Sequence, residues 1–325
     1  MERGRAEFVS TPKPQLKPGH ALVRTGLISL CGSDVHLLYH SEPELYPFAV
    51  GTTGHEMVGV VEEVDAAESD LRPGDVVLAL APTHEAMTEL FLVPIDDVIV
   101  LPRGAPLEHL LMAQQLGTVI YACKHLPNLV GKTAAVVGQG SAGLYFDSML
   151  RRMGCECVIG LDVKAARVEA GRRFGATHTV NAELGNGLEA VSEFTGGLLA
   201  DVVVEAAGEV SAINIAASLV KGGGHVVFFG VPRVHRFEFD YFSFYRKYCT
   251  TRSISGATSE PGRLSFGMAV KLIHEGQIDV SSMLTHRFNF DEVMRAYELA
   301  YTRDDGVIKA IIEMPGYACL LYDPG

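Results

Sequence analysis

Three residues near the start of the chain, Cys31, His55 and Glu56, carry side chains that bind transition metals. Thiolate, imidazole and carboxylate groups are all ligands of Zn²⁺, and a catalytic zinc takes three protein ligands and leaves one position open. Such an ion lowers the pKa of a bound water to about 7, and the same effect on an alcohol would prepare it to give up a hydride. Ser33 and His36 follow Cys31 closely enough to carry the alcohol's proton away. These residue types and spacings predict a zinc centre that activates an alcohol.

The two motifs that contain these residues resemble those of a known family. Cys-Gly-Ser-Asp-Val-His at 31–36 and Gly-His-Glu at 54–56 are similar to motifs of the zinc-dependent medium-chain alcohol and polyol dehydrogenases. The match is strongest with the sorbitol, threonine and glucose dehydrogenase branch. The resemblance implies that Cys31 and His55 bind zinc, that Ser33 hydrogen-bonds the alcohol and that His36 relays its proton. It also implies that Asp34 orients the ligand histidine, which fixes the tautomer of a metal-bound imidazole.

The resemblance is less regular at the third zinc position, which falls on Gln114, where many family members have Cys, Asp or Glu. An amide oxygen is a neutral and weak zinc ligand. Glutamine at position 114 therefore favours Glu56 as a direct ligand. We expect Gln114 to act either directly or through a water molecule, and we do not expect His84 or His109 to bind metal. The segment 74–90 contains no cysteine, whereas many relatives carry a structural zinc on a cysteine-rich lobe there. The sequence therefore predicts one metal ion per chain.

A second pattern begins near residue 119, where apolar strands alternate with helical segments. The strand 134–137 leads into Gly138-Gln139-Gly140-Ser141-Ala142-Gly143, a helix follows, and the next strand ends at Asp162. A GxGxxG turn between a strand and a helix, with an acidic residue ending the next strand, is typical of dinucleotide binding. The helix N-terminus favours the pyrophosphate, and the Asp162 carboxylate would bind the ribose hydroxyls and repel a 2′-phosphate. We therefore predict NAD as the cofactor.

Further cofactor contacts are expected from both parts of the chain. Ala207, Phe229 and Val231 lie where later strands end, and the resemblance places such segments on the nicotinamide side. The predicted cofactor-binding residues are Thr118, Gly138, Gly140, Ser141, Ala142, Gly143, Asp162, Arg167, Ala207, Phe229, Val231 and Lys309. For Lys309, a pyrophosphate contact and a solvated surface position are equally acceptable.

The patterns predict an α/β fold with two domains. Residues 1–117 and 258–325 are expected to form a GroES-like β-barrel catalytic domain, with several strands already in residues 1–28. Residues 118–257 are expected to form a Rossmann domain with a doubly wound parallel sheet, in which ligands bind at the carboxyl ends of the strands. The active site is expected in the cleft between the domains.

Composition narrows the class of protein further. The chain has 325 residues, 48% of them hydrophobic, with 27 Lys and Arg against 39 Asp and Glu and a formal net charge of −12. This acidic balance, without a basic run, argues against a nucleic-acid partner. No apolar run reaches the length of about 18 residues typical of a membrane span, and no secretory signal is recognised. The six cysteines are scattered, which indicates a reducing, cytoplasmic setting.

The predicted function is reversible hydride transfer between a secondary alcohol, such as a polyol or sugar, and NAD. The expected partner is thus a small-molecule alcohol, and the resemblance implies a homodimer or homotetramer. Two alternatives stay open: a zinc-free quinone or enone reductase of the same superfamily, and a nucleotide-binding protein that has lost catalysis. Metal content separates the first from the prediction, and the intact Ser33, Asp34 and His36 argue against the second.

Overall fold

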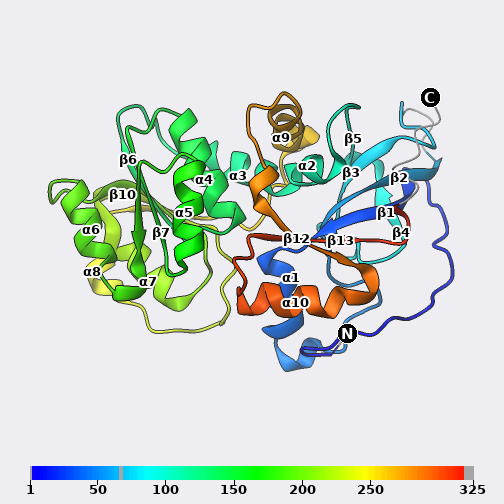
Figure 1. Ribbon diagram of the computed structural model, residues 1–325, viewed down its shortest axis with the longest axis horizontal. Coiled ribbons are helices and arrows are strands. Elements are labelled where there is room, and N and C mark those ends of the chain that lie inside the picture. Colours follow the sequence, from blue (N-terminus) through cyan, green and yellow to red (C-terminus); the bar gives the residue numbers. More distant parts are fainter. Residues whose placement is uncertain (1, 66–68, 318–325) are drawn as a thin grey trace. The chain divides into compact units, whose positions relative to one another are not determined.

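The computed structural model describes residues 2–65 and 69–317. Its chain divides into two compact units, one formed by 1–117 with 258–325 and the other by 118–257. The blue, orange and red strands in Figure 1 belong to the first unit, and the green and yellow-green elements belong to the second. Each unit is described separately below.

The first unit is built on a mostly antiparallel sheet. Its strands are β1 (His20–Ser29), β2 (Glu56–Asp65), β3 (Val76–Leu80), β4 (Leu90–Pro94), β5 (Val98–Val100), β12 (Leu284–Asn289) and β13 (Lys309–Glu313). They follow the order β12-β13-β1-β2-β3-β5, and β4 also pairs with β1. Among the described strands of this sheet, β12 and β13 are the one parallel pair. This is the β domain that the sequence predicted.

The prediction of several strands within residues 1–28 was wrong. In the described part of that segment, β1 is the one strand, and Glu2 and Arg5 add an isolated bridge. Proline has no backbone N–H to donate to a sheet, and Pro12, Pro14 and Pro18 lie in the segment before β1. The chain therefore enters the sheet at His20.

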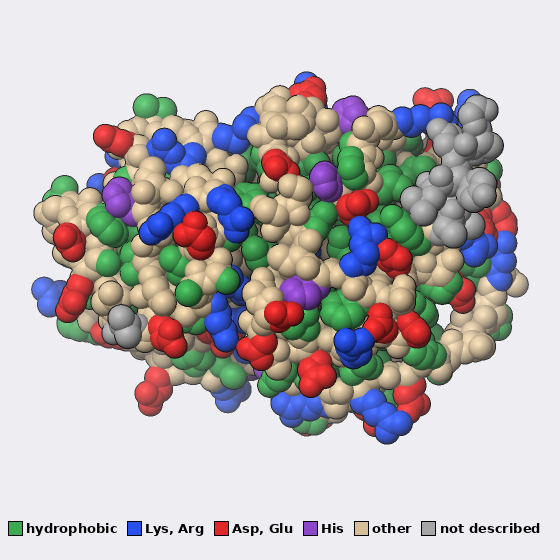
Figure 2. Space-filling model, viewed as in Figure 1, with side chains coloured by type: hydrophobic (Ala, Val, Ile, Leu, Met, Phe, Trp, Pro, Cys, Tyr) green, Lys and Arg blue, Asp and Glu red, His purple; other side chains and the backbone are tan. Residues whose placement is uncertain are grey.

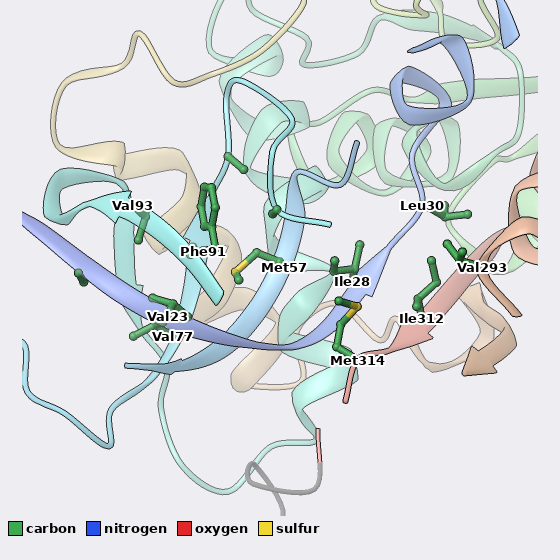
Figure 3. Packing of buried hydrophobic residues seen from close by; sticks show 14 of the residues in the cluster. Val23, Ile28, Leu30, Met57, Val77, Phe91, Val93, Val293, Ile312 and Met314 are labelled. Atoms are coloured by element: carbon green, nitrogen blue, oxygen red, sulfur yellow. The ribbon is translucent and has the colours of Figure 1, made fainter. Parts of the chain in front are cut away.

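Strand β1 is the centre of the first unit because it pairs with β2, β4 and β13. Eight of its ten residues are buried, so both faces of this strand are covered by other parts of the unit. Figure 3 shows Val23 and Ile28 of β1 packing with residues from the neighbouring strands, among them Met57 and Ile312. Each fully buried aliphatic side chain of this kind contributes about 1.5–3 kcal/mol.

Helices and short 3₁₀ turns cover the sheet and connect its strands. The α-helices of the first unit are α1 (Gly32–Tyr39), α2 (Leu107–Leu111), α3 (Ala113–Cys123), α9 (Leu264–His274) and α10 (Val293–Thr302), and the boundary between the units falls inside α3. The 3₁₀ turns are Pro43–Leu45, Ile95–Asp97, Pro261–Arg263, Ser281–Met283 and Phe290–Glu292. The last of these leads directly into α10.

The second unit has a fully parallel sheet. Its strands are β6 (Thr133–Val137), β7 (Cys157–Asp162), β8 (His178–Asn181), β9 (Ala200–Glu205), β10 (Val220–Phe228) and β11 (Thr250–Ser253), in the order β11-β10-β9-β6-β7-β8. Its helices are α4 (Ser141–Arg152), α5 (Ala165–Arg173), α6 (Gly187–Phe194), α7 (Val210–Leu219) and α8 (Tyr241–Tyr245), with a 3₁₀ turn at Ala182–Leu184. The strand order reverses between β6 and β9. In open α/β sheets ligands bind outside the carboxyl ends of the strands at such a point.

The surface shows no concentration of basic side chains on the face drawn in Figure 2. Lys and Arg are interspersed there with Asp and Glu. Within the described residues, every helix is too short or too polar to cross a membrane.

One close helix contact gives a stability test. A Cβ added at Gly117 of α3 would lie 2.4 Å from Phe266 Cδ1 and 2.9 Å from its Cα, and Phe266 is fully buried in α9. Helix propensity alone favours Ala over Gly by about 1 kcal/mol, but overpacking costs about 1–3 kcal/mol. We expect Gly117→Ala to lower the free energy of unfolding, measured by urea denaturation.

Gly267 provides the matched control, because it lies in α9, is exposed, and has no atom within 4 Å of an added Cβ. Gly267→Ala should leave the free energy of unfolding unchanged or raise it by up to about 1 kcal/mol. Equal effects of the two substitutions would contradict the packing argument.

Candidate metal centre and dinucleotide site

The spacing of Cys31 and Asp34 is explained by the start of helix α1. Cys31 is the N-cap, and Asp34 occupies the third helical position. Its Oδ2 accepts a hydrogen bond from the Cys31 backbone N–H at 3.0 Å, as in a capping box. The first residue of the motif is thereby fixed relative to the fourth, with the Cys31 side chain held at the helix start.

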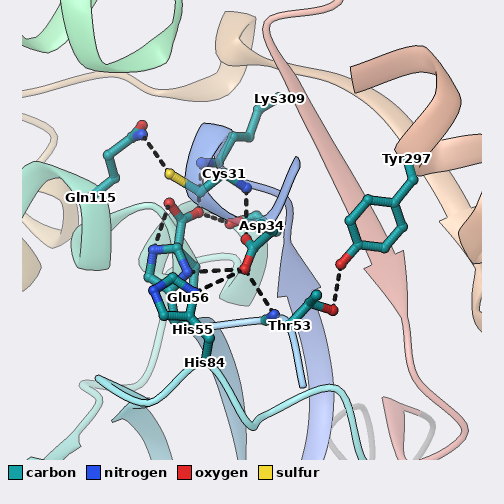
Figure 4. A network of polar contacts seen from close by, with 11 residues as sticks. Cys31, Asp34, Thr53, His55, Glu56, His84, Gln115, Tyr297 and Lys309 are labelled. Atoms are coloured by element: carbon teal, nitrogen blue, oxygen red, sulfur yellow. Dashed lines mark hydrogen bonds and ion pairs between the residues drawn. The ribbon is translucent and has the colours of Figure 1, made fainter. Parts of the chain in front are cut away.

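The other oxygen of Asp34 accepts hydrogen bonds from three N–H groups (Figure 4). Its Oδ1 lies 2.9 Å from the Gly54 backbone nitrogen and 3.2 Å from Nδ1 of both His55 and His84. Burial alone would raise the pKa of Asp34, but the two imidazoles hold it below its ordinary value. When His55 donates from Nδ1, its Nε2 is left as the lone-pair donor that a metal requires. Asp34 therefore has the geometry predicted for a residue that orients the ligand histidine.

The turn before His55 has an unusual backbone. Thr53 has φ +93° and Gly54 has φ +77°, and a β-branched residue in this region is strained. The Tyr297 hydroxyl of α10 donates to Thr53 Oγ1 at 2.5 Å, and Thr53 N donates to the His84 carbonyl at 2.7 Å. These contacts hold the strained turn in place.

Glu56 opens β2 directly opposite Ser29 of β1 and is fully buried. Its Oε2 accepts a hydrogen bond from the Ser29 hydroxyl and lies 2.6 Å from Lys309 Nζ. Burial works to lower the pKa of Lys309, but Glu56 and then Cys31 outweigh burial and raise it. The other oxygen, Glu56 Oε1, is buried and has no hydrogen-bond partner among the described residues.

The position of Lys309 corrects one expectation from the sequence. A solvated surface lysine was one of two alternatives, and it is wrong because the residue is 1% exposed. A contact with a pyrophosphate stays a prediction, and in this structure the ammonium group is paired with Glu56.

The three predicted ligands fit a metal ion. Donor atoms of Cys31, His55 and Glu56 all lie within 4.8 Å of one another, and His55 Nε2 is 4.0 Å from Glu56 Oε1. A buried carboxylate oxygen without a partner is costly, and a cation between these groups would remove that cost. Asp34, His55 and His84 form a second close group, but there the carboxylate already accepts N–H groups, which explains the proximity without a metal.

Gln114, Gln115, Ser33 and His36 are the other polar residues of this unit that bear on the candidate site. Gln114 and Gln115 are both 7% exposed, and Gln115 Nε2 donates to Cys31 Sγ across 3.7 Å. A ligand role for Gln114 stays a prediction. Ser33 and His36 are half-buried and lie one turn apart on α1, so their side chains share a helix face.

The glycine-rich turn of the second unit has the close approach that glycine permits. Gly138 has φ +97°, and a Cβ at Gly143 would lie 1.8 Å from the Gly138 carbonyl oxygen. Gly140 is the N-cap of α4, which begins with Ser141, Ala142 and Gly143. The free backbone N–H groups of a helix start form an anion site.

Asp162 and Arg167 lie beside this turn. Asp162, at the end of β7, accepts from Gln139 N at 2.7 Å and from Lys164 N at 2.9 Å. The Arg167 guanidinium of α5 would be 3.7 Å from a Cβ at Gly140. The structure thus brings the predicted phosphate and ribose contacts together. Thr118 is half-buried in α3.

The predicted nicotinamide-side residues are joined by Glu205, a residue to which the sequence assigned no role. Its buried Oε1 accepts from Ala207 N and Gly208 N, both at 2.7 Å, and its backbone carbonyl accepts from Phe229 N at 2.9 Å. Val231 contacts the same turn, because its carbonyl oxygen is 2.0 Å from the position of a Cβ at Gly208. The sequence signal that could have identified Glu205 is its position as an acidic residue directly after the apolar run 202–204.

His84 and Gln115 also belong to the candidate metal centre, although the sequence analysis assigned neither of them a role there. Both approach it through tertiary contacts, with Asp34 and with Cys31, that lie 50 and 84 residues away in sequence. No motif within the chain links positions so far apart.

Comparisons with known proteins match both units. The family described as alcohol dehydrogenase GroES-like domain matches residues 17–102, and the family described as zinc-binding dehydrogenase matches residues 142–275. An alcohol dehydrogenase of Cupriavidus necator is 26% identical over 96% of this chain and 97% of its own length. Sorbitol dehydrogenase 1 of Saccharomyces cerevisiae is 27% identical over 94% of each chain. Among solved structures, alcohol dehydrogenase TADH from Thermus sp. ATN1 has a TM-score of 0.82 and 26% identity, covering 97% of this chain and 98% of its own.

The two family matches together span about two thirds of the chain, with the GroES-like match before the zinc-binding dehydrogenase match. They agree with the antiparallel β domain, the parallel dinucleotide-type sheet and the converging Cys31, His55 and Glu56. The chain therefore belongs to the zinc-dependent medium-chain alcohol and polyol dehydrogenases, a family of oxidoreductases.

Proposed function

We propose that this dehydrogenase transfers a hydride between a small secondary alcohol and NAD, using one zinc ion bound by Cys31, His55 and Glu56. The observation that carries the proposal is the buried Glu56 Oε1, which has no hydrogen-bond partner among the described residues and lies beside a thiol and an imidazole. Lys309 and Ser29 hold the opposite oxygen of this carboxylate, so Oε1 is directed at the other two donors. Such a constellation suits a divalent cation better than any hydrogen-bonding role.

Zinc bound there would supply a Lewis acid that makes an alcohol easier to deprotonate. Ser33 would accept the hydroxyl proton, and His36, one turn further along α1, would pass it to solvent. NAD bound to the second unit would supply the acceptor for the hydride that leaves with the electron pair of the carbinol C–H bond. The products are a ketone, NADH and one proton.

The choice of NAD rests on Asp162. Its carboxylate is held at the end of β7 by two backbone N–H groups, which favours ribose hydroxyls and disfavours a 2′-phosphate. Among substrates we propose polyols and related sugars, because the yeast relative is named a sorbitol dehydrogenase.

Zinc content tests the metal centre directly. Cys31→Ser should reduce zinc affinity by more than about 100-fold, because even residues that only orient ligands are worth about 10–100-fold, and NAD⁺ reduction should be lost. Zinc is measured by elemental analysis after dialysis against a chelator. Cys157→Ser, a half-buried cysteine of the second unit, is the control and should keep both zinc and activity.

Ser33→Ala separates proton transfer from metal binding. It should keep full zinc content while kcat falls by about 100-fold, within the range for loss of a proton-transfer group. Full activity in Cys31→Ser without zinc would overturn the proposed function.

Asp34→Asn tests the orientation of the His55 imidazole. Asp34→Asn replaces an acceptor of four N–H groups by an amide with a single acceptor oxygen, so His55 should lose its fixed tautomer. We expect zinc affinity to fall by about 10–100-fold, measured by competition with a chromophoric chelator. His84→Asn removes one of the two imidazoles but leaves the Asp34–His55 bond, and its effect should be smaller. An unchanged zinc affinity in Asp34→Asn would contradict the orienting role.

Asp162→Ser tests the cofactor choice. Asp162→Ser removes the charged acceptor, and hydrogen bonds to charged groups contribute about 1.5–3 kcal/mol. The ratio of kcat/KM for NAD over NADP should therefore fall about tenfold to a hundredfold. Asp240→Ser is the control, because Asp240 is the N-cap of α8 and Ser also serves as an N-cap. A parent-like ratio in Asp162→Ser would argue against the predicted ribose contact.

A further inference from the structure

The second unit contains a buried glutamate whose side chain has no role in the proposed mechanism. Glu205 ends β9 and is fully buried. Its Oε1 accepts hydrogen bonds from Ala207 N and Gly208 N, both at 2.7 Å. Gly208 is itself buried, and a buried backbone N–H without an acceptor is costly. The Glu205 side chain therefore stabilises the turn 206–208, which follows its own strand.

The same residue also binds the turn 229–231, which follows β10. Its backbone carbonyl accepts hydrogen bonds from Phe229 N at 2.9 Å and from Gly230 N at 3.0 Å. A Cβ at Gly230 would lie 2.8 Å from Glu205 Oε2 and 2.3 Å from Gly208 N. The two turns are thus packed against each other, and the Glu205 carboxyl group lies against both.

Both turns lie at the carboxyl ends of strands, where an open parallel sheet binds its ligand. Strand β9 is the neighbour of β6, and a Cβ at Gly138 would lie 2.8 Å from the Ala207 Cβ. The turn after β9 therefore borders the glycine-rich turn. The glycine-rich turn is held independently by β7, because Gly138 N donates to the Leu161 carbonyl at 2.7 Å.

The acceptor role of Glu205 does not require a charge. Burial raises the pKa of Glu205, and backbone N–H groups of the two turns offset part of that rise. The second oxygen, Oε2, has no hydrogen-bond partner among the described residues. An amide oxygen has the same two lone pairs for accepting N–H groups, so glutamine could replace Glu205 in this role and leucine could not.

We propose that Glu205 is a positioning residue that joins the turns 206–208 and 229–231 into one support for the nicotinamide half of the dinucleotide. The predicted nicotinamide-side residues Ala207, Phe229 and Val231 all lie in these turns. Glu205 acts through them, because its own carboxyl group is buried. The inference rests on the NAD role proposed above.

The test compares NAD⁺ with ADP, which lacks the nicotinamide half, by titration calorimetry on the full-length protein. Glu205→Leu should weaken NAD⁺ binding about tenfold to a hundredfold, the effect of one or two lost hydrogen bonds. ADP should bind within about threefold of the parent, because sites without shared partners contribute independently and ADP reaches only the Gly138 turn and Asp162. A purely structural role would weaken both ligands equally, which would overturn the proposal.

Glu205→Gln is the conservative variant. It keeps the oxygen that accepts from Ala207 N and Gly208 N, so NAD⁺ should bind within about threefold of the parent, less than the effect of one lost hydrogen bond. A Gln variant as weak as the Leu variant would overturn the acceptor role.

Gly230→Ala tests the same junction from the other turn. The added methyl group would lie 2.3 Å from Gly208 N, so the two turns must move apart, and NAD⁺ binding should fall about tenfold, a loss within the range of overpacking. Gly222→Ala is the matched control, because Gly222 is an exposed residue of β10 whose added Cβ would have its nearest neighbour, the Lys247 carbonyl oxygen, at 3.9 Å. Equal NAD⁺ affinities in the two alanine variants would overturn the proposal.

Thermal unfolding and zinc content are measured on every variant. Zinc should be unchanged, since Glu205 and Gly230 lie outside the unit that holds the three predicted ligands. Gly230→Ala carries the test if Glu205→Leu does not fold. A parent protein that retains zinc but does not bind NAD⁺ would overturn the proposed function together with this inference. Parent-like NAD⁺ binding in Glu205→Leu would overturn the inference alone.

Discussion

The proposed metal centre depends on the hydrogen bonds that the Asp34 carboxylate accepts. This carboxylate is buried, and its two oxygens accept N–H groups from Cys31, Gly54, His55 and His84. Four donors from three separate segments thus converge on one charge that could not remain ionised in the interior without them. The same contacts cap α1, orient the ligand imidazole and bring the segment around His84 against the turn before β2. Asp34 therefore connects the start of α1, the start of β2 and the loop that contains His84.

The second buried carboxylate, Glu56, has a different set of hydrogen-bond partners. One of its oxygens is held by Lys309 and Ser29, while the other has no hydrogen-bond partner in the described part of the chain. Ser29 and Glu56 are register partners in β1 and β2, and β13, which begins at Lys309, pairs with β1. The central sheet therefore places Glu56 with one oxygen bound by Lys309 and Ser29 and the other facing the proposed metal position. An isolated buried ion pair is weak evidence for stability, so the arrangement is better explained by the need for a correctly aimed ligand.

Local sequence predicted the parts of the site that local geometry determines. The spacing of Cys31 and Asp34 is that of a helix cap, and the turn from Gly138 to Gly143 is defined by strand, glycine and helix in succession. Lys309, Gln115 and Glu205 were assigned no role or a different one, because their contacts depend on which strands pair and which helices pack together. The strands expected before His20 failed for a simpler reason, since proline removes the N–H groups that a sheet needs.

The loop 81–89 shows how such long-range support arises. It connects β3 to β4, and it docks on the turn before His55 through the pairs Thr53 N to His84 O, Ala86 N to Gly54 O and Met87 N to Thr53 O, at 2.7–3.1 Å. His84 itself has φ +57°, and strained residues persist only where surrounding contacts over-determine them. Two strained segments, 53–54 and His84, thus stabilise each other by hydrogen bonds, and the shared Asp34 oxygen closes the arrangement. The turn that carries His55 is therefore held by contacts from both segments.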